Sequence, residues 1–391
     1  MEQVKIGIIG VGNMGRTHAK NIVEGKCPEL KLVAVADLNP ERLQWVHKEL
    51  DPEVALFSTA EELLDSGLMD AVIVAVPHYD HPKYALECFR RGLHVMVEKP
   101  AGVYTKQVRQ MNEAARHAGV KFGMMFNQRT NPVFRKMREL VQSGEYGQIK
   151  RTNWIITSWY RPQFYYDSGD WRATWKGEGG GVLLNQCPHN LDLWQWICGM
   201  PVKVRSQMYF GKWHDIEVED DVTTFVEYAN GATGVFVTST GDTPGTNRFE
   251  ITLERAKIIA EGGKLTLWEL EMSEPEFSKI NKEFFGQPKN VQIDVELESP
   301  PKEKLGHVGV LNAFAAAILR DEPMIAGGEE GINGLTLSNA MHLSAFLGKE
   351  VELPFDEDLF YEELQKRVKT SRVKTNVVSA VADTEGSYNT K

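Results

Sequence analysis

The feature that most constrains the fold of this chain is a glycine pattern directly after an apolar run near its start. In "VKIGIIGVGNMG" the apolar run covers Val4 to Ile9, and a helical pattern follows from Arg16 to Val23. Between them stand Gly10, Gly12 and Gly15 in a G-x-G-x-x-G spacing. The first glycine permits a tight turn, the second lets backbone approach a pyrophosphate, and the third lets the helix pack on the strand. The order of strand, glycine turn and helix therefore predicts a dinucleotide site.

A second apolar run, "LKLVAVAD", supports this site because it ends in an acidic residue. Asp37 lies about twenty residues past the glycines, where a carboxylate takes the ribose hydroxyls of a dinucleotide. The residues that follow, "LNP", offer no arginine to a 2′-phosphate, so the sequence favours NAD over NADP. Asp37 also suits the N-cap of a helix that begins near Pro40, and one side chain can serve both purposes.

Strands and helices keep alternating through the first third of the chain. The apolar runs "MDAVIVAVP", "LHVMVEKP" and "VKFGMMFN" are separated by the helical patterns "HPKYALECFRRG" and "TKQVRQMNEAARHAG". Such alternation predicts a doubly wound parallel sheet, a Rossmann domain over residues 1–126. Ligands bind such sheets beyond the carboxyl ends of the strands, and Lys99 stands at one of those ends.

The stretch "HYDH" after Pro77 looks like a metal-binding pair. A zinc site needs further ligands at workable geometry, and nothing obvious in the sequence supplies them, so we expect no metal. His78 and His81 are better explained as part of a loop that faces the cofactor and as the start of the next helix. We therefore expect Pro77, His78 and His81 near the dinucleotide, with Asn13 and Met14 of the glycine turn.

The pattern changes after Asn127. Stretches with alternation or β-branched residues, such as "IKRTNWIITSW", "VKVRSQMYF" and "DVTTFVEYANGATGVFVTST", follow each other without long helices. They predict an α+β domain with a large open, mostly antiparallel sheet over residues 127–355, whose helices after 305 pack back toward the first domain. Residues 356–391 look like an extension on the surface or on a neighbouring subunit. Because an uncovered sheet face is a liability, we expect a homodimer or homotetramer formed through it.

Charge and cysteine usage exclude several classes of partner. The net charge of −10 argues against binding to nucleic acids or anionic membranes. Four cysteines without a CxxC pair or zinc spacing suggest a reducing compartment. The start "MEQVKIGIIG" has no signal-like features, and no segment approaches the length of a membrane span. The sequence therefore predicts a cytoplasmic protein.

The stretch "GEGGGVLLNQCPHNLDLWQW" is the strongest candidate for chemistry outside the nucleotide site. It carries Asn185, His189 and Asp192 at spacings of four and three, which share one face of a helix, and Pro188 starts or bends that helix. The plain alternative is a satisfied polar face on a buried helix, and Asp192 fits that alternative best. Beside a nicotinamide, however, His189 has a suitable pKa to take the proton of an alcohol as the hydride leaves. Lys99 can then stabilise the developing alkoxide.

The segment before this stretch, "SWYRPQFYYDSGDWRATW", is rich in rings that can stack on a sugar and in groups that can bond hydroxyls. Many of its aromatic residues must belong to the core or to an interface. We expect five of its residues to contact the substrate: Tyr160, Arg161, Trp171, Arg172 and Trp175.

Together, "GIIGVGNMG", "EKP" and "GGGVLLNQCPHNLDL" resemble the glucose–fructose oxidoreductase and inositol dehydrogenase family (Gfo/Idh/MocA). The resemblance covers almost the whole chain and includes "FNQRTNP" and "GINGLTLSNAMHLSAFLGKEVELP". It implies a Rossmann domain plus an open-sheet domain, hydride transfer between NAD(P) and a sugar or cyclic polyol, and a dimer or tetramer.

The resemblance also implies roles for single residues. The family lysine falls on Lys99 and the family histidine on His189, while Glu98 and Pro100 shape the nicotinamide site. Three residues where the chain crosses between the domains lie near cofactor and substrate: Asn127, Gln128 and Arg129.

The chain departs from the family pattern at Asn185, where the family usually has aspartate four residues before the histidine. Asparagine can hold a hydroxyl but cannot act as a base, so the proton falls to His189. A change of Asn185 to Asp is expected to be tolerated structurally and to alter the pH profile.

These observations predict an NAD-dependent oxidoreductase that converts a ring secondary hydroxyl of a sugar, glycoside or inositol to a ketone, with Lys99, His189 and Asn185 at its centre. A rival is a glycosidase that oxidises a ring transiently, eliminates the aglycone and reduces the ring again. A third possibility is a non-enzymatic NAD-binding sensor, against which intact Lys99 and His189 argue.

Overall fold

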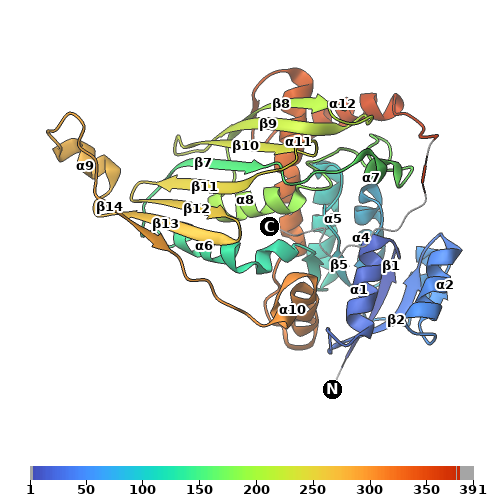
Figure 1. The fold of residues 1–391 in the computed structure, drawn as a ribbon. Helices are drawn as coiled ribbons and strands as arrows, with labels where there is room; N and C mark the ends of the chain where they lie inside the picture. Colours follow the sequence, from blue (N-terminus) through green and yellow to red (C-terminus); the bar gives the residue numbers. More distant parts are fainter. Residues whose placement is uncertain (1–2, 376, 379–391) are drawn as a thin grey trace.

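The structure, a computed structural model, describes residues 3–375 and 377–378 and contains two β-sheets (Figure 1). The first sheet has six strands in the order β3-β2-β1-β4-β5-β6, and all its neighbouring strands are parallel. The predicted doubly wound parallel sheet is therefore confirmed. The strand order reverses between β1 and β4, which is where sheets of this kind bind ligands.

Strands and helices alternate along this part of the chain, as the sequence pattern indicates. The strands are β1 (Val4–Ile9), β2 (Leu30–Ala36), β3 (Ala55–Phe57), β4 (Ala71–Val74), β5 (His94–Val97) and β6 (Phe122–Met124). The helices are α1 (Asn13–Val23), α2 (Pro40–Glu49), α3 (Ala60–Asp65), α4 (His81–Arg90) and α5 (Thr105–Ala118).

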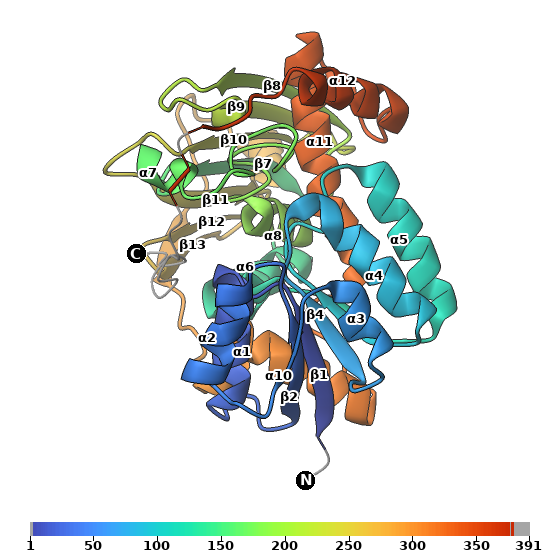
Figure 2. The same cartoon turned by 90° about the vertical axis from the view of Figure 1, so that its right-hand side faces the viewer.

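Helices cover both faces of this sheet, because its strands carry apolar side chains on both sides. Ile6 and Ile8 of β1 pack in one core with α1, α2 and α10 (Gly306–Arg320), whereas Ile9 packs in another with α3, α4 and α5. Figure 2 shows α1 and α2 on one side and α4 and α5 on the other. Phe314 of α10, which comes from far along the chain, is fully buried in the first of these cores.

The second sheet has nine strands in the order β14-β13-β12-β11-β7-β10-β9-β8-β15, and all neighbours are antiparallel except β7 and β10. The predicted large, mostly antiparallel sheet is therefore confirmed. Its strands are β7 (Ile149–Ile156), β8 (Lys203–Phe210), β9 (Glu219–Glu227), β10 (Thr233–Ser239), β11 (Asn247–Leu253), β12 (Ala256–Glu261), β13 (Lys264–Leu270), β14 (Asn290–Asp294) and β15 (Val351–Glu352). The helices of this half are α6 (Pro132–Gln142), α7 (Gln163–Asp167), α8 (Pro188–Cys198), α9 (Glu274–Ile280), α11 (Gly331–Leu347) and α12 (Glu357–Lys369). Short 3-10 turns are η1 (His78–Asp80), η2 (Asn127–Thr130), η3 (Lys302–Lys304) and η4 (Gly328–Glu330).

One face of the nine-stranded sheet is covered by helices, among them α6, α8 and α11, and within the described residues no helix covers the other face (Figure 1). On the covered face, Trp154 of β7 is fully buried and stacks on Phe249 of β11, with ring centroids 4.2 Å apart. The neighbouring residue Ile155 points to the opposite face and is 41% exposed, and Phe225 of β9 is 58% exposed there. The two faces differ because successive side chains of a strand alternate.

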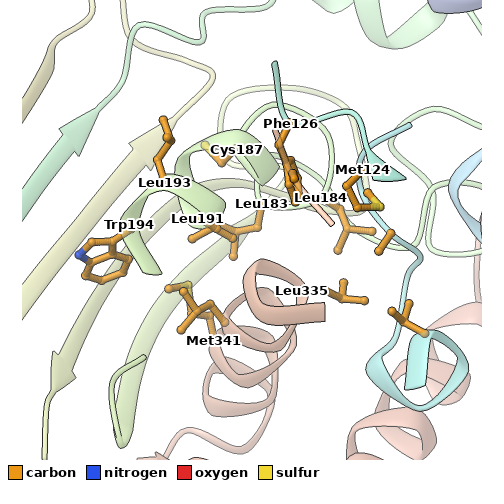
Figure 3. Close-up of a cluster of buried hydrophobic side chains, with 14 of the residues drawn as sticks. Met124, Phe126, Leu183, Leu184, Cys187, Leu191, Leu193, Trp194, Leu335 and Met341 are labelled. Atoms are coloured by element: carbon orange, nitrogen blue, oxygen red, sulfur yellow. The ribbon is translucent and has the colours of Figure 1, made fainter. Parts of the chain in front are cut away.

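Helix α8 lies in the middle of this half, between the sheet and α11. Nine of its eleven residues are buried, and four of these are polar: His189, Asn190, Asp192 and Gln195. Trp194 stacks on Phe236 of β10 with ring centroids 5.3 Å apart, while Leu191 lies toward Met341 of α11 (Figure 3). This packing fixes the position of α8, and with it the position of His189 in the first turn of the helix.

The segment before α11 joins the two halves of the molecule. Gly123 of β6 forms a β-bridge with Gly327, and the Met124 N–H donates to the Ala326 carbonyl at 3.2 Å. The domain bounds at residues 126 and 355 remain predictions, and residues 379–391 of the predicted extension lie outside the described residues. In the described part, no helix is both long and apolar enough to cross a bilayer.

Candidate active site

The glycine turn after β1 has the geometry that a pyrophosphate requires. Gly10 has a φ of +92°, which favours glycine, and a Cβ on Gly15 would collide with the Gly10 carbonyl oxygen. A Cβ on Gly12 would meet nothing closer than the Arg42 guanidinium at 3.9 Å, so this backbone is open to a ligand. Helix α1 begins here without a side-chain cap, and its N-terminus carries the positive end of the helix dipole. The turn therefore fits the dinucleotide that the sequence predicts, with Asn13 and Met14 in the first turn of α1.

Asp37, at the end of β2, lies against this turn. Its Oδ2 accepts the Val11 N–H at 2.7 Å, and its Oδ1 accepts the Asn39 N–H at 2.8 Å. The expectation that Asp37 caps the next helix is wrong, because the N-cap of α2 is Asn39, whose side chain accepts the Glu41 N–H at 2.9 Å. The carboxylate instead holds the glycine turn through Val11, and its contact with the ribose remains a prediction.

The residues directly after Asp37 offer no arginine, but the structure brings one to it from further along the chain. Arg42 Nη1, from the first turn of α2, lies 3.4 Å from Asp37 Oδ2. Partial burial and nearby Arg42 lower the pKa of Arg16, and Asp37 opposes this, so Arg16 belongs to the same group of charges. A search of the residues directly after Asp37 could not find these arginines, because helices bring them back to the loop.

Lys99 stands directly beyond the carboxyl end of β5 and reaches the second half of the molecule. Its Nζ donates to the Asn185 backbone carbonyl at 2.9 Å. Removal from water lowers the pKa of Lys99, and Arg172 and Arg161 add to this, while Glu98 and Glu178 oppose it. The structure therefore brings the "EKP" segment and the "GGGVLLNQCPH" segment together, 86 residues apart along the chain.

His189 lies in the first turn of α8 and is 2% exposed. Its ring meets the edge of Phe126 with centroids 6.2 Å apart. Burial holds the pKa of His189 well below its usual value, Lys99 adds to this, and Glu98 opposes it. The imidazole is therefore neutral at physiological pH, which is the state that accepts a proton.

The Gly177–Trp196 stretch is not one helix: of the two possibilities that the sequence left for Pro188, a helix start or a bend, the structure has the start. Helix α8 begins at Pro188, and Asn185 lies in the turn before it. Proline favours the first helical position, because its fixed φ suits a helix start and its missing N–H is not needed there. Glu219 holds this turn by accepting the N–H groups of Gly181 at 2.8 Å and Leu183 at 3.0 Å. Asn185 and His189 are therefore positioned by different elements.

Asp192 and Arg129 pair with each other in the interior. Arg129 donates to both carboxylate oxygens of Asp192 at 2.7 and 2.6 Å, and to Glu330 at 2.6 Å. The structural role expected for Asp192 agrees with this geometry. The buried ion pairs favour a structural role for Arg129 too, over the predicted contact with the cofactor.

Asn127 and Gln128, which precede Arg129 in η2, are better placed than Arg129 to contact a ligand. Gln128 is half-buried, and Asn127 is 4% exposed. Within the described residues, the Asn127 side-chain oxygen is buried and has no hydrogen-bond partner. Because such a group costs free energy unless it is bonded, Asn127 suits a ligand contact.

The two histidines of "HYDH" are both buried but differ in their surroundings. His81 has its Nδ1 2.6 Å from the Pro100 carbonyl and its Nε2 2.7 Å from the Val76 carbonyl, so it links the loops after β4 and β5. His78 Nδ1 lies 3.3 Å from the Glu178 carbonyl, and exposed Pro77 precedes it. Among the described residues, no group of three histidine, cysteine or acidic side chains is close enough to hold a metal.

The predicted substrate residues fall into two groups. Arg172 and Arg161 both lie over the Tyr165 ring, at 4.7 and 5.2 Å from its centroid, and the Tyr165 hydroxyl lies 3.2 Å from Asn185 Oδ1. Trp171 meets His78 with ring centroids 5.7 Å apart. In contrast, the buried Trp175 packs among aromatic rings of the core, and Tyr160 is 45% exposed. Substrate contacts from all these residues remain predictions.

The described end of the chain crosses this aromatic segment. Arg372 N–H donates to Glu217 Oε2 at 2.9 Å, and Trp175 N–H donates to the other oxygen of the same carboxylate at 2.6 Å. Lys374 donates to the Tyr166 carbonyl at 2.7 Å. The segment after α12 thus fixes the loop that carries the predicted substrate residues.

A group of buried charges behind Lys99 was missed by the sequence patterns. His18 of α1 lies 2.7 Å from Glu98, and its ring meets that of His307, from the start of α10, at 5.6 Å between centroids. Burial raises the pKa of Glu98, but His18, His307 and Lys99 outweigh it and lower that pKa to about 2. The position of His18, three residues after Gly15, could have placed it near the cofactor site from the sequence. Nothing in the sequence around His307 indicates that it lies beside His18.

We expect half-buried His307 to make the protein less stable in acid. Burial lowers the pKa of His307 to about 4, against about 6.5 for a histidine in an unfolded chain. Between these values the unfolded chain binds the extra proton, so stability is fully present above about pH 6.5 and falls toward pH 4. In His307→Asn this loss should be smaller by about 2 kcal/mol, after allowance for solvent screening. Urea unfolding of the wild type and of His307→Asn, above and below this pH range, measures the difference. Equal losses of unfolding free energy in the two proteins would show that His307 does not cause the acid sensitivity.

Comparison with known proteins agrees with this arrangement. Residues 4–126 match the model of an oxidoreductase family with an NAD-binding Rossmann fold, and residues 134–259 match the GFO/IDH/MocA C-terminal domain. Myo-inositol 2-dehydrogenase of Thermotoga maritima is 25% identical over 358 residues, which cover 90% of this chain and 98% of that protein. The NAD(+)-dependent scyllo-inositol 2-dehydrogenase of Bacillus subtilis is 26% identical over 239 residues, which cover 59% of this chain and 66% of that protein.

Solved structures extend the comparison. The WlbA dehydrogenase of Bordetella pertussis, in complex with NADH and UDP-GlcNAcA, is 25% identical and superposes with a TM-score of 0.77, covering 91% of this chain and 99% of that one. A levoglucosan dehydrogenase, 18% identical with a TM-score of 0.75 over 90% of this chain and all of that one, shares the fold. The chain therefore belongs to the Gfo/Idh/MocA family of oxidoreductases, and its six-stranded sheet is the NAD(P)-binding Rossmann fold of that family.

Proposed function

We propose that this protein oxidises a ring secondary hydroxyl of a sugar, glycoside or inositol to a ketone, reversibly and with NAD. The observation that carries the proposal is the contact between Lys99, at the end of β5, and the turn that leads from Asn185 into His189. This contact lies beyond the carboxyl ends of the Rossmann strands, where the ligands of such sheets bind. The names of the inositol dehydrogenases and the sugar nucleotide in the WlbA complex support the substrate class.

The two central side chains divide the work of alcohol oxidation. A bound nicotinamide supplies the hydride acceptor. Lys99, as an ammonium, orients the hydroxyl and stabilises negative charge on its oxygen as the C–H bond breaks. His189 is neutral because it is buried, so it can take the hydroxyl proton. Loss of this proton and of the hydride turns the C–O single bond of the alcohol into the C=O bond of a ketone. Asn185 holds the sugar or the lysine by hydrogen bonds and carries no charge of its own.

The choice of NAD over NADP rests on Asp37. Its carboxylate is hydrogen-bonded to the glycine turn, from where it would accept the ribose hydroxyls of NAD and repel a 2′-phosphate. Arg42 and Arg16 weaken this repulsion, since both lie near the same carboxylate. We therefore expect a preference for NAD that is measurable but not absolute.

A screen of cofactor reduction tests the proposed function. The purified full chain is mixed with NAD or NADP and with a panel of inositols, aldoses, sugar acids and glucosides, and reduced cofactor is followed by its absorbance. Accumulation of NADH with a member of the panel supports the dehydrogenase. Release of an aglycone without accumulation of NADH would contradict the dehydrogenase and indicate the glycosidase that oxidises its substrate transiently. Binding of NAD without turnover of any compound would indicate a sensor.

We also propose that the open face of the nine-stranded sheet joins two copies of the chain. Ile155 and Phe225 are exposed on this face, and burial of such side chains favours association. Light scattering should give the mass of a dimer or tetramer, and a monomer at micromolar concentration would contradict the proposal.

A further inference from the structure

One buried carboxylate at the site has no task in the proposed reaction. Glu178 is 2% exposed and stands in "GEGGG", seven residues before Asn185. Its Oε1 accepts a hydrogen bond from the Asn185 side-chain amide, and its Oε2 accepts the Ala173 N–H at 2.6 Å. We propose that Glu178 is a positioning residue, which orients Asn185 and provides the negative charge that position 185 lacks. This inference rests on the proposed function.

The hydrogen bonds around Asn185 have a direction, and Glu178 sets it. An ionised carboxylate only accepts hydrogen bonds, so Asn185 must turn its NH2 group toward Glu178 and its Oδ1 away. Oδ1 then accepts the Tyr165 hydroxyl at 3.2 Å, and the Tyr165 oxygen accepts from Arg172 Nη1 at 3.0 Å. Every donor in this chain therefore points toward Glu178. A glutamine at position 178 would impose no direction, because its amide both donates and accepts.

The same turn supports Lys99. Lys99 Nζ donates to the backbone carbonyl of Asn185 at 2.9 Å, so the residue that Glu178 orients is also the one that holds the ammonium. Removal from water lowers the pKa of Lys99, and the negative charges of Glu98 and Glu178 raise it. Glu178 thereby helps to keep Lys99 protonated.

Other charged and titratable groups surround Glu178 and Lys99, and their ionisation also affects the dependence of kcat on pH. The groups that face Glu178 are Arg172, Lys99, Glu219, Tyr166 and Lys374, with His78 on its backbone carbonyl. Those that face Lys99 are Glu98, Glu178, Arg172, Arg161, His78, His81, Cys187, His189 and His307. Burial raises the pKa of Glu178, and Arg172 is the largest opposing influence.

Glu178→Gln tests this role with an isosteric side chain. We expect kcat to fall about tenfold with KM nearly unchanged, since one charged hydrogen bond is lost from the site. The alkaline limb of kcat should move down by about one pH unit, because the loss of the negative charge lowers the pKa of Lys99 further. NAD affinity and the urea midpoint should stay near those of the wild type.

A double variant provides the rescue. In Glu178→Gln with Asn185→Asp, the carboxylate and the amide exchange places, the Tyr165 hydroxyl can still donate to position 185, and the local charge is restored. The alkaline limb should return toward the wild-type pH. The single Asn185→Asp change places two carboxylates against each other, so the expectation that it is tolerated is revised, and it should be less active than the double variant.

Glu217→Gln is the matched control. Glu217 also holds the aromatic segment, through the Trp175 N–H, but the other hydrogen bonds of its carboxylate within the described residues are to Ser371 and Arg372, not to Asn185. Loosening of the loop alone should therefore leave the alkaline limb of Glu217→Gln in place.

The outcomes separate this inference from the proposed function. A wild type that turns over no compound overturns the proposed function, and the inference with it. An active wild type whose pH profile is unchanged in Glu178→Gln overturns only the role of Glu178. Equal shifts in Glu178→Gln and Glu217→Gln would also overturn it. If Glu178→Gln does not fold, the double variant decides: a wild-type alkaline limb supports the role, and a lowered limb overturns it.

Discussion

Replacing Lys99 by methionine is expected to lower kcat by about a thousandfold while NAD binds nearly as well as to the wild type. Methionine keeps most of the side-chain volume but removes the ammonium that donates to the Asn185 carbonyl and that we propose faces the reacting oxygen. His189→Ala should lower kcat by about two to four orders of magnitude, because no other neutral base takes its place in the first turn of α8. Steady-state kinetics with the best compound of the panel, together with titration of NAD by fluorescence, measures both effects.

Two surface changes control for this pair. Lys106 and His117 have side chains that are 50% and 77% exposed, so Lys106→Met and His117→Ala make the same chemical changes away from the site. Both controls should keep the wild-type kcat. Near wild-type turnover in Lys99→Met or His189→Ala would remove that residue from the mechanism.

The second large effect concerns the glycine turn, where two identical substitutions should act in different ways. A Cβ on Gly15 would meet the Gly10 carbonyl oxygen, which is backbone and cannot give way cheaply. Gly15→Ala should therefore destabilise the protein by about 3 kcal/mol and abolish NAD binding. A Cβ on Gly12 would meet only the end of the Arg42 side chain at 3.9 Å. Gly12→Ala should keep stability to within about 1 kcal/mol yet weaken NAD binding at least about tenfold, because the methyl group stands where the pyrophosphate approaches.

Urea unfolding and NAD titration of both variants distinguish these mechanisms. Loss of NAD affinity in Gly12→Ala at unchanged stability assigns Gly12 to the ligand and Gly15 to the packing of α1 on β1. If Gly12→Ala binds NAD as the wild type does, the pyrophosphate does not lie against this turn.

Local patterns were sufficient for the parts of the fold where structure follows from neighbouring residues. The glycine spacing after β1 and the alternation of apolar strands with helices predict the Rossmann sheet, because strand period, helix period and turn chemistry act over a few residues. The same holds for the open sheet, whose two faces are visible in the alternation around Trp154 and Ile155. The "EKP" and "GGGVLLNQCPH" motifs led to Lys99 and His189 by resemblance, and the fold places them within reach of one turn.

Contacts between distant residues lay beyond these patterns. Arg42 near Asp37, His307 beside His18, and Arg129 paired with Asp192 each join residues whose proximity depends on how helices pack. The spacing of Asn185 and His189 was misleading, because Asn185 lies in the turn before α8. Pro188 was a local signal for the helix start, whereas the hydrogen bond from the preceding turn to Glu219 joins residues far apart in the sequence. Glu178 is the clearest example: in the sequence it is one acidic residue among glycines, and burial against Asn185 makes it the end of a directed chain of hydrogen bonds. Charge and hydrogen-bond direction at this site are properties of side chains brought together by the packed core, and so they were decided only when the chain folded.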